Sequence, residues 1–220
     1  IGWLENDGTN ASFSGNTIAS GTNAGQADDC WEIEVLDFDG DGDYDVVAAI
    51  EDDDDINWYE NDGTNTSFTA REVLRTGNQD AVRFIDVLDF DGDGDYDVGY
   101  SAHAEDRMGI AINDGTNLSF TDLQICEGGA TTQCDQPRDI EIFDIDEDGD
   151  YDIFGVSYND YYLFWWENDG TNASFTKNTI VNGNPGANGA YDIEIADMDF
   201  DGDYDVALAS WEDDRLAWWR

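Results

Sequence analysis

The chain has 220 residues, of which 53 are acidic and 8 basic, for a formal net charge of -45 at pH 7. Such a surface repels nucleic acid and anionic lipid, which argues against binding to either. Hydrophobic residues make up 40% of the chain, enough for a folded core. No apolar run reaches the roughly 18 residues of a membrane span, so we expect no membrane insertion.

One unit of predicted structure runs from Trp31 to about residue 76. It begins with an alternating segment and a nearly continuous apolar run, typical of a half-buried and a central strand. A third segment, rich in aromatic residues, is followed by an Asn-Asp-Gly turn and then by a fourth segment. Asn and Gly tolerate the positive φ that such tight turns need. The four predicted strands are residues 31–38 (WEIEVLDF), 44–51 (YDVVAAIE), 56–61 (INWYEN) and 66–74 (TSFTAREVL). No segment has convincing helical periodicity, so the sequence predicts an all-β fold.

The same order of elements recurs along the chain. Acidic loops begin at Asp37, Asp89, Asp144 and Asp197, at intervals of 52, 55 and 53 residues. A fixed period of this size is typical of a repeat architecture. Residues 1–5 (IGWLE) align with residues 216–220 (LAWWR), 215 positions later, so the chain holds four periods and one duplicated strand.

Each acidic loop alternates aspartates around a glycine. Ca²⁺ prefers six to eight oxygen ligands, and loop positions 1, 3, 5, 7 (through its carbonyl) and 9 supply them, with glycine at position 6 for the sharp turn. Without metal, so many neighbouring carboxylates would repel one another. The sequence therefore predicts four structural Ca²⁺ sites, and the alternative is a solvated acidic turn. The candidate ligands are Asp37, Asp39, Asp41, Asp43 and Asp45; Asp89, Asp91, Asp93, Asp95 and Asp97; Asp144, Asp146, Asp148, Asp150 and Asp152; and Asp197, Asp199, Asp201, Asp203 and Asp205.

The D-x-D-x-D-G-D-x-D loop after a strand, followed by an apolar strand and a W-x-E-N-D-G turn, resembles the VCBS/FG-GAP repeat family. The resemblance covers essentially the whole chain, although the literal F-G/G-A-P signature is absent. It implies integrin-α-like β-propeller blades of four antiparallel strands with Ca²⁺ in the first hairpin, in extracellular or cell-surface proteins. We therefore expect one repeat domain over residues 1–220, belonging to a longer array or assembly. It would divide into a partial blade 1–29, blades 30–78, 79–133 and 134–186, and a partial blade 187–220.

The sequence also contains candidate sites of covalent modification. Cys126 and Cys134 bracket a Gly/Thr-rich insertion and are the candidate disulfide pair, which would imply an oxidising compartment. Cys30 would be left over, either buried or paired outside the chain. An N-x-S triplet follows each hairpin turn. The triplet is either an acceptor site for an N-glycan or a favourable turn sequence that was copied when the repeat was duplicated. The four acceptor candidates are Asn10, Asn65, Asn117 and Asn172.

Catalysis is not expected. His103 is the only histidine, and no nucleophile or phosphate-binding motif occurs. The absence of an initial Met or a signal-like segment suggests a processed product or a piece of something longer. We expect an extracellular, calcium-stabilised structural or adhesive module that self-associates head-to-tail through its terminal strands. Two alternatives stay open: a calcium-dependent, lectin-like propeller that binds glycans through third-strand tryptophans, or a non-catalytic accessory domain of a secreted enzyme.

Overall fold

The computed structural model describes residues 1–21, 27–52, 54–75, 81–128, 134–183 and 187–220. This part of the chain contains β-strands and no helix, which confirms the all-β prediction. None of it forms a helix that could cross a membrane.

The strands of the described part form five antiparallel sheets in chain order. The N-terminal hairpin pairs β1 (Gly2–Asn6) with β2 (Phe13–Thr17). The first sheet holds β3 (Cys30–Leu36), β4 (Asp45–Ile50), β5 (Asp55–Asn61) and β6 (Phe68–Arg75). The second holds β7 (Val82–Leu88), β8 (Asp97–Ala102), β9 (Arg107–Asn113) and β10 (Phe120–Glu127). The third holds β11 (Pro137–Phe143), β12 (Asp152–Ser157), β13 (Tyr162–Asn168) and β14 (Phe175–Asn182). The C-terminal sheet holds β15 (Ala190–Ala196), β16 (Asp205–Ser210) and β17 (Arg215–Trp219).

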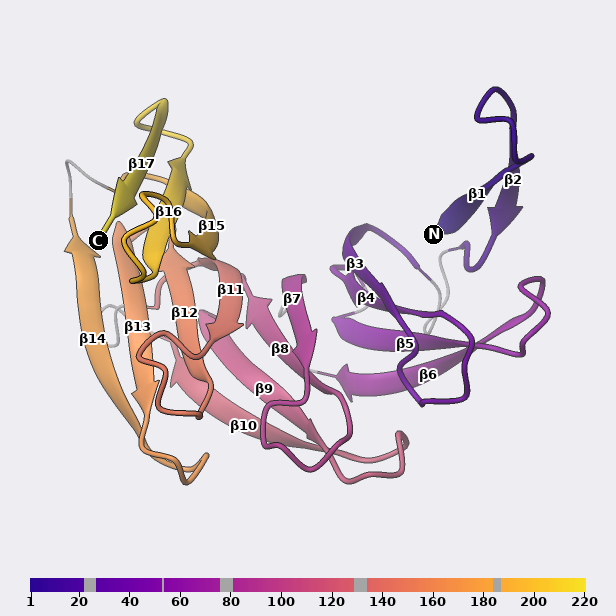
Figure 1. Cartoon of the computed structure of the whole chain (residues 1–220), viewed down its shortest axis with the longest axis horizontal. Coiled ribbons are helices and arrows are strands. Elements are labelled where there is room, and N and C mark those ends of the chain that lie inside the picture. Colours follow the sequence, from indigo (N-terminus) through magenta and orange to yellow (C-terminus); the bar gives the residue numbers. More distant parts are fainter. Residues whose placement is uncertain (22–26, 53, 76–80, 129–133, 184–186) are drawn as a thin grey trace.

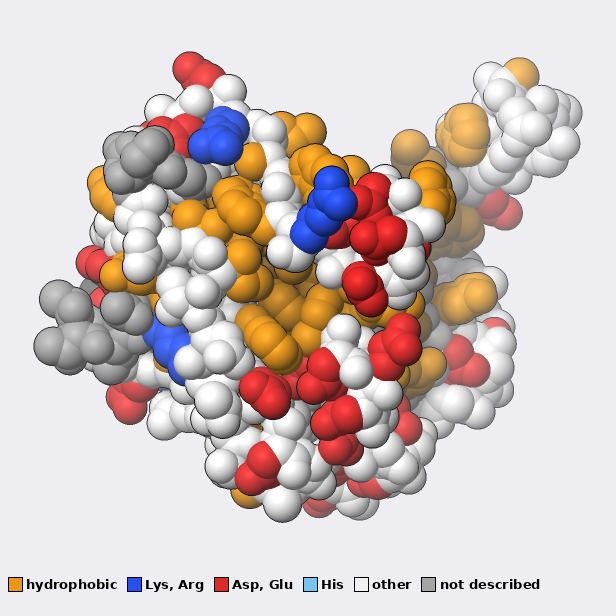
Figure 2. Space-filling model, turned by 60° about the vertical axis from the view of Figure 1, so that its left-hand side comes forward, with side chains coloured by type: hydrophobic (Ala, Val, Ile, Leu, Met, Phe, Trp, Pro, Cys, Tyr) orange, Lys and Arg blue, Asp and Glu red, His pale blue; other side chains and the backbone are white. Residues whose placement is uncertain are grey.

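The sheets follow one another along an open arc, with the N-terminal hairpin and the C-terminal sheet at its two ends (Figure 1). The first strand of each larger sheet contacts the first strand of the next, in the order β3, β7, β11, β15. One face of the molecule is hollowed at its centre, where hydrophobic side chains gather beside acidic ones (Figure 2). The repeat order of the sequence is thus the spatial order of the sheets.

The second strand of each four-stranded sheet is buried along its whole length, which explains its continuous apolar sequence. Successive side chains of a strand point to opposite faces. On β4, Val47 and Ala49 pack toward the second sheet, whereas Val46, Ala48 and Ile50 pack toward the N-terminal hairpin. Both sides of β4 are therefore covered by neighbouring elements.

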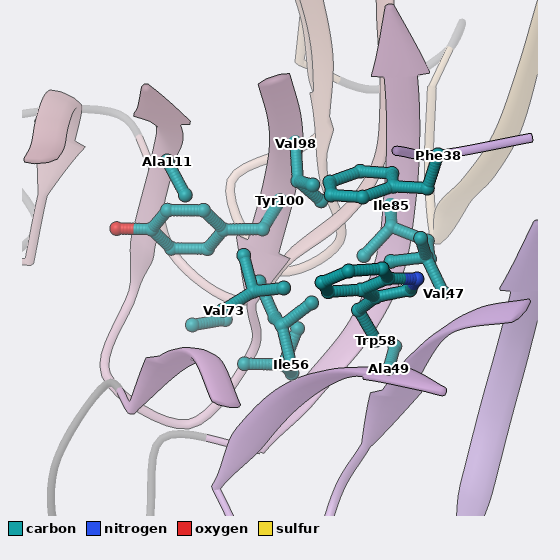
Figure 3. Close-up of a cluster of buried hydrophobic side chains, with 12 residues drawn as sticks. Phe38, Val47, Ala49, Ile56, Trp58, Val73, Ile85, Val98, Tyr100 and Ala111 are labelled. Carbon is teal, nitrogen blue, oxygen red and sulfur yellow. The ribbon is translucent and has the colours of Figure 1, made fainter. Parts of the chain in front are cut away.

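The hydrophobic core consists of layers between consecutive sheets. Between the first and second sheets, Trp58 and Ile56 of β5 meet Tyr100 and Val98 of β8 (Figure 3). Similar clusters join the second sheet to the third and the third to the C-terminal sheet. Because each layer needs residues from two repeats, an isolated repeat would leave its apolar face in water.

Carboxylates link the first strands of consecutive sheets. Glu32 accepts a hydrogen bond from the backbone N–H of Ile85 at 2.7 Å, and Asp139 accepts one from Ile193 at 2.7 Å. Asp86 accepts in the same way from the backbone of β11. These contacts satisfy N–H groups at an edge strand, which would otherwise be buried without a partner.

The pKa values of these carboxyls, and of the neighbouring Glu141 on β11, are raised because the groups are buried beside one another. Burial, followed by the charge of Asp86 and other neighbours, raises the pKa of Glu141 to about 8. Burial likewise raises the pKa of Glu32 to about 7 and that of Asp139 well above its usual range. A carboxyl with a raised pKa favours the folded state most at low pH, and this contribution is lost as the pH rises through its folded pKa.

We therefore predict that Glu141→Gln raises the melting temperature more at pH 8 than at pH 5, in saturating calcium. Ionisation of Glu141 opposes folding, and this cost grows as the pH rises from its ordinary pKa of 4.5 to its folded pKa of about 8. Thermal melts of both proteins across this range measure the difference. Glu5→Gln, at an exposed position of β1, is the control and should give no such trend. A Glu141→Gln difference that is constant with pH would contradict the prediction.

Candidate metal centres

Each aspartate loop joins the first strand of a sheet to its second and is folded by its own side chains. The first aspartate accepts a hydrogen bond from the backbone N–H of the glycine at position 6, for example Asp37 from Gly42 at 3.0 Å. That glycine has φ of 98–100° in all four loops, a conformation that glycine adopts without strain. The same bond recurs in the pairs Asp89–Gly94, Asp144–Gly149 and Asp197–Gly202.

Three carboxylates of each loop come together. In every cluster one oxygen from each of three aspartates lies within 4.8 Å of the others, a spacing suited to one cation. The first two aspartates of the loop take part in all four clusters, and the third member is at position 5 or 9. The clusters are Asp37, Asp39 and Asp41; Asp89, Asp91 and Asp97; Asp144, Asp146 and Asp148; and Asp197, Asp199 and Asp205.

Several cluster oxygens are buried without a partner. Asp37 Oδ1, Asp89 Oδ1 and Asp199 Oδ1 accept no hydrogen bond from any described residue. A buried, unpaired carboxylate oxygen is strongly unfavourable, and a bound cation would satisfy it. The clusters hold only hard oxygen donors, so the residues fit Ca²⁺.

The aspartate at position 9 makes backbone contacts that the sequence analysis did not predict. Asp45 is almost fully buried, and its two oxygens accept from the backbone N–H groups of Phe38 at 3.2 Å and Asn61 at 2.7 Å. It thus ties the loop to the end of β5. Asp97 and Asp152 make the same pair of bonds, and burial raises the pKa of each to about 6. In the fourth loop Asp205 accepts from Met198.

The aspartate at position 7 was predicted to bind through its carbonyl, and its side chain lies against the next turn. A Cβ atom on Gly63 would come within 2.7 Å of Asp43 Oδ2. Gly115 with Asp95 and Gly170 with Asp150 repeat this arrangement. The Asn-Asp-Gly turn therefore needs glycine for its positive φ and also for room beside the aspartate loop.

The cysteines and the sequon asparagines predicted as modification sites lie in different local environments. Cys126 and Cys134 form a disulfide, and Cys30 is a half-buried free thiol. The four sequon asparagines all have positive φ, and each side-chain oxygen accepts from the asparagine four residues earlier. Asn10 and Asn65 are exposed, whereas Asn117 and Asn172 are half-buried.

Comparison with known proteins identifies one family. The model of the FG-GAP-like repeat matches residues 37–100 and 144–208, more than half of the chain. Each match includes two aspartate loops and the strand that follows the first of them. No curated protein matches the chain significantly.

Solved structures share the fold at low sequence identity. A lectin from Agrocybe aegerita that recognises non-reducing terminal N-acetylglucosamine is 17% identical, with a TM-score of 0.59 over 90% of this chain and 52% of the lectin. An exo-β-1,3-galactanase from Phanerochaete chrysosporium is 12% identical, with a TM-score of 0.53 over 84% of this chain and 44% of the enzyme. The chain thus spans about half the length of these proteins, and the likeness concerns fold alone.

We predict that Gly63→Ala lowers the melting temperature in calcium more than Gly8→Ala does. The two glycines occupy equivalent turns of different repeats, with φ of 77° and 82°, so both variants carry a similar backbone strain of about 1 kcal/mol. Only Gly63 lies against an aspartate loop, whereas a Cβ on Gly8 meets nothing within 4 Å. Calorimetric melts with a calcium titration measure the difference. Equal losses in the two variants would refute the proposed contact between turn and loop.

Proposed function

Because the chain belongs to the FG-GAP-like repeat family, we propose that it is a calcium-stabilised structural or adhesive module built from β-propeller-type blades. It would act outside the cell or at its surface, without catalysis. The observation that carries this proposal is the recurrence of one aspartate cluster in four consecutive sheets, with a buried unpaired oxygen in three of them. The disulfide supports an oxidising compartment.

Calcium would act by removing charge repulsion. With 53 acidic residues against 8 basic ones, each loop concentrates repulsion on the hairpin that supports a core layer. A cation bound by the folded loop and not by the unfolded chain stabilises the fold by mass action. Four Ca²⁺ ions would therefore link calcium concentration to the stability of the whole array.

Chelation tests this role. We predict that excess EDTA lowers the melting temperature by more than about 10 °C and that Ca²⁺ restores it, because about 3 kcal/mol is expected from one site at 100-fold excess over its Kd. Mg²⁺ at the same concentration should restore less, since it dehydrates reluctantly and requires a strict octahedron. Calorimetry with ion-matched buffers is the measurement. Identical melts with and without chelator would reject the calcium role.

Self-association is supported by uncovered faces at the two ends of the arc. Leu216 on β17 is 80% exposed, whereas its repeat equivalents Ile56, Met108 and Leu163 are at most 1% exposed. These equivalents pack against the following sheet. The outer face of the C-terminal sheet is thus an inter-sheet surface without a covering sheet among the described residues.

The opposite end has the complementary face. Ile33 on β3 is 43% exposed, whereas its equivalents Ile85, Ile140 and Ile193 are at most 4% exposed because a preceding sheet covers them. The N-terminal hairpin covers only part of this face, and an apolar hollow remains beside Ile33. A second copy of the chain, joined head-to-tail, would supply the missing contact.

We predict that Leu216→Asp abolishes calcium-dependent association of the chain. The charge would be buried without a partner in a contact that resembles the internal layers. Sedimentation velocity over a range of protein concentrations measures the effect. Leu118→Asp, at a turn residue of similar 64% exposure, should leave association unchanged. A monomer at all concentrations in the native protein, or equal behaviour of both variants, would contradict the proposal.

Glycan binding through third-strand tryptophans is less well supported. Trp58 and Trp166 are at most 4% exposed and pack between sheets. Trp218, at 40%, is the more accessible of these rings. Core packing therefore accounts for most of the aromatic content of these strands.

A further inference from the structure

A row of side chains lies at the end of the sheets opposite the aspartate loops. Each first strand pairs with its second strand through a β-bulge near its beginning. A bulge changes the direction of a side chain relative to the regular pleat. The residues at these bulges are Trp31, Arg83, Arg138 and Tyr191.

A second row comes from the residues that directly follow the second strands. Each of them donates its backbone N–H to the carbonyl just before the first strand of its own sheet, at 2.9–3.2 Å. The shared bond establishes that the positions are equivalent in the four repeats. They are occupied by Glu51, His103, Tyr158 and Trp211.

Arg83 has a complete set of partners from the preceding repeat. Its Nε and Nη2 donate to the two carboxylate oxygens of Glu51 at 3.0 and 2.5 Å. Its guanidinium lies over the ring of Trp31, 4.2 Å from the centroid. A bidentate carboxylate is the arrangement that best satisfies a buried arginine.

Arg138, one repeat later, has no such carboxylate among the described residues. The residue equivalent to Glu51 in the preceding repeat is His103. Burial, followed by the charges of Arg138 and Arg83, lowers the pKa of His103 to about 4, so this imidazole is neutral at pH 7. Arg138 is only 7% exposed, and its Nε and Nη1 are buried without a hydrogen-bond partner in the described part of the chain. Unpaired guanidinium donors at this depth are unfavourable and point to a missing acceptor.

Aromatic rings hold this arginine at the edge of a hollow. Its guanidinium lies 5.0 Å from the ring centroid of Tyr158 and 5.5 Å from that of Tyr191. These two rings, Arg138 and Trp211 line a hollow of about 240 Å³. The Trp211 ring is 73% exposed, and it also borders an adjoining hollow with Arg215.

We propose that this hollow binds a saccharide that carries a carboxylate, such as a hexuronate residue. Arg138 would take the carboxylate in the way Arg83 takes that of Glu51, and the exposed face of Trp211 would stack on the sugar ring. An aromatic ring buries a large apolar area at a small cost in conformational entropy, which suits a sugar face. The proposal goes beyond the structural role and does not depend on it.

The acidic groups at the rim do not occupy Arg138. Glu212 accepts a hydrogen bond from the Tyr158 hydroxyl at 3.1 Å. Asp192 borders the adjoining hollow and is exposed. Among the described residues neither makes an ion pair with Arg138, so its guanidinium is available to an incoming carboxylate.

The test uses the whole chain in calcium buffer at about 0.15 M salt, where exposed charges more than about 8 Å apart are largely screened. Glucuronate, glucose and acetate are titrated against the ¹⁵N-labelled protein, and the Trp211 indole signal is assigned from Trp211→Phe. Glucuronate should shift this signal with at least tenfold higher affinity than either glucose or acetate. Equal affinity for acetate would show that the sugar ring is not recognised, and equal affinity for glucose would show that the carboxylate is not. If no ligand shifted the signal, the site itself would be refuted.

Variants locate the contact. Arg138→Met keeps an apolar stem and should weaken glucuronate binding at least tenfold, whereas Arg83→Met, the matched variant of the preceding repeat, should weaken it less than threefold. His103→Glu gives Arg138 the partner that Arg83 has in Glu51; it should raise the melting temperature and abolish binding. This gain of stability keeps the test decisive if Arg138→Met folds poorly. Undiminished binding in either Arg138→Met or His103→Glu would refute the assignment.

Discussion

Electrostatic repulsion within the four aspartate loops is the constraint on which the rest of the structure depends. Each loop turns the chain from the first strand of a sheet into its second strand, which is buried along most or all of its length, so the loop's conformation fixes the register of a whole sheet. In the described residues the loop is held by its own carboxylates, which accept backbone N–H groups at positions such as Gly42 and Phe38. The oxygens left over, such as Asp37 Oδ1, are those that a cation would satisfy.

Carboxylates also have a structural role away from the loops. Carboxylates on the first strand of one sheet reach to the next sheet and accept hydrogen bonds from the backbone N–H groups of its first strand. Strand edges that would otherwise invite wrong pairing are thus satisfied within the chain. Because these acids are buried and lie close together, their pKa values rise, and the stability of the stacked sheets depends on pH. A chain of such high negative charge is therefore suited to a medium that supplies cations.

Repetition explains both the regularity of the fold and its exceptions. Equivalent positions have the same structural role in successive sheets. A residue that differs from its equivalents in exposure or pairing therefore identifies a place with a different environment. Leu216 and Ile33 depart in exposure, which singles out the two end faces of the arc. Arg138 departs in pairing, since the residue that should neutralise it is His103 and not a glutamate. Comparison between repeats within one chain thus provides an internal control for each inference.

The sequence by itself determined the all-β class, the four-strand unit and the position of the aspartate clusters, because strand alternation, turn residues and loop spacing are local properties. Tertiary structure decided what depends on neighbours: the two backbone hydrogen bonds of Asp45, the contact of Asp43 with Gly63, and the unpaired donors of Arg138. These features join residues from different strands or repeats, and no local pattern records which carboxylate reaches which donor. Burial, which sets both the pKa values of the inner-strand acids and the exposure of the end faces, likewise arises only when the sheets are stacked.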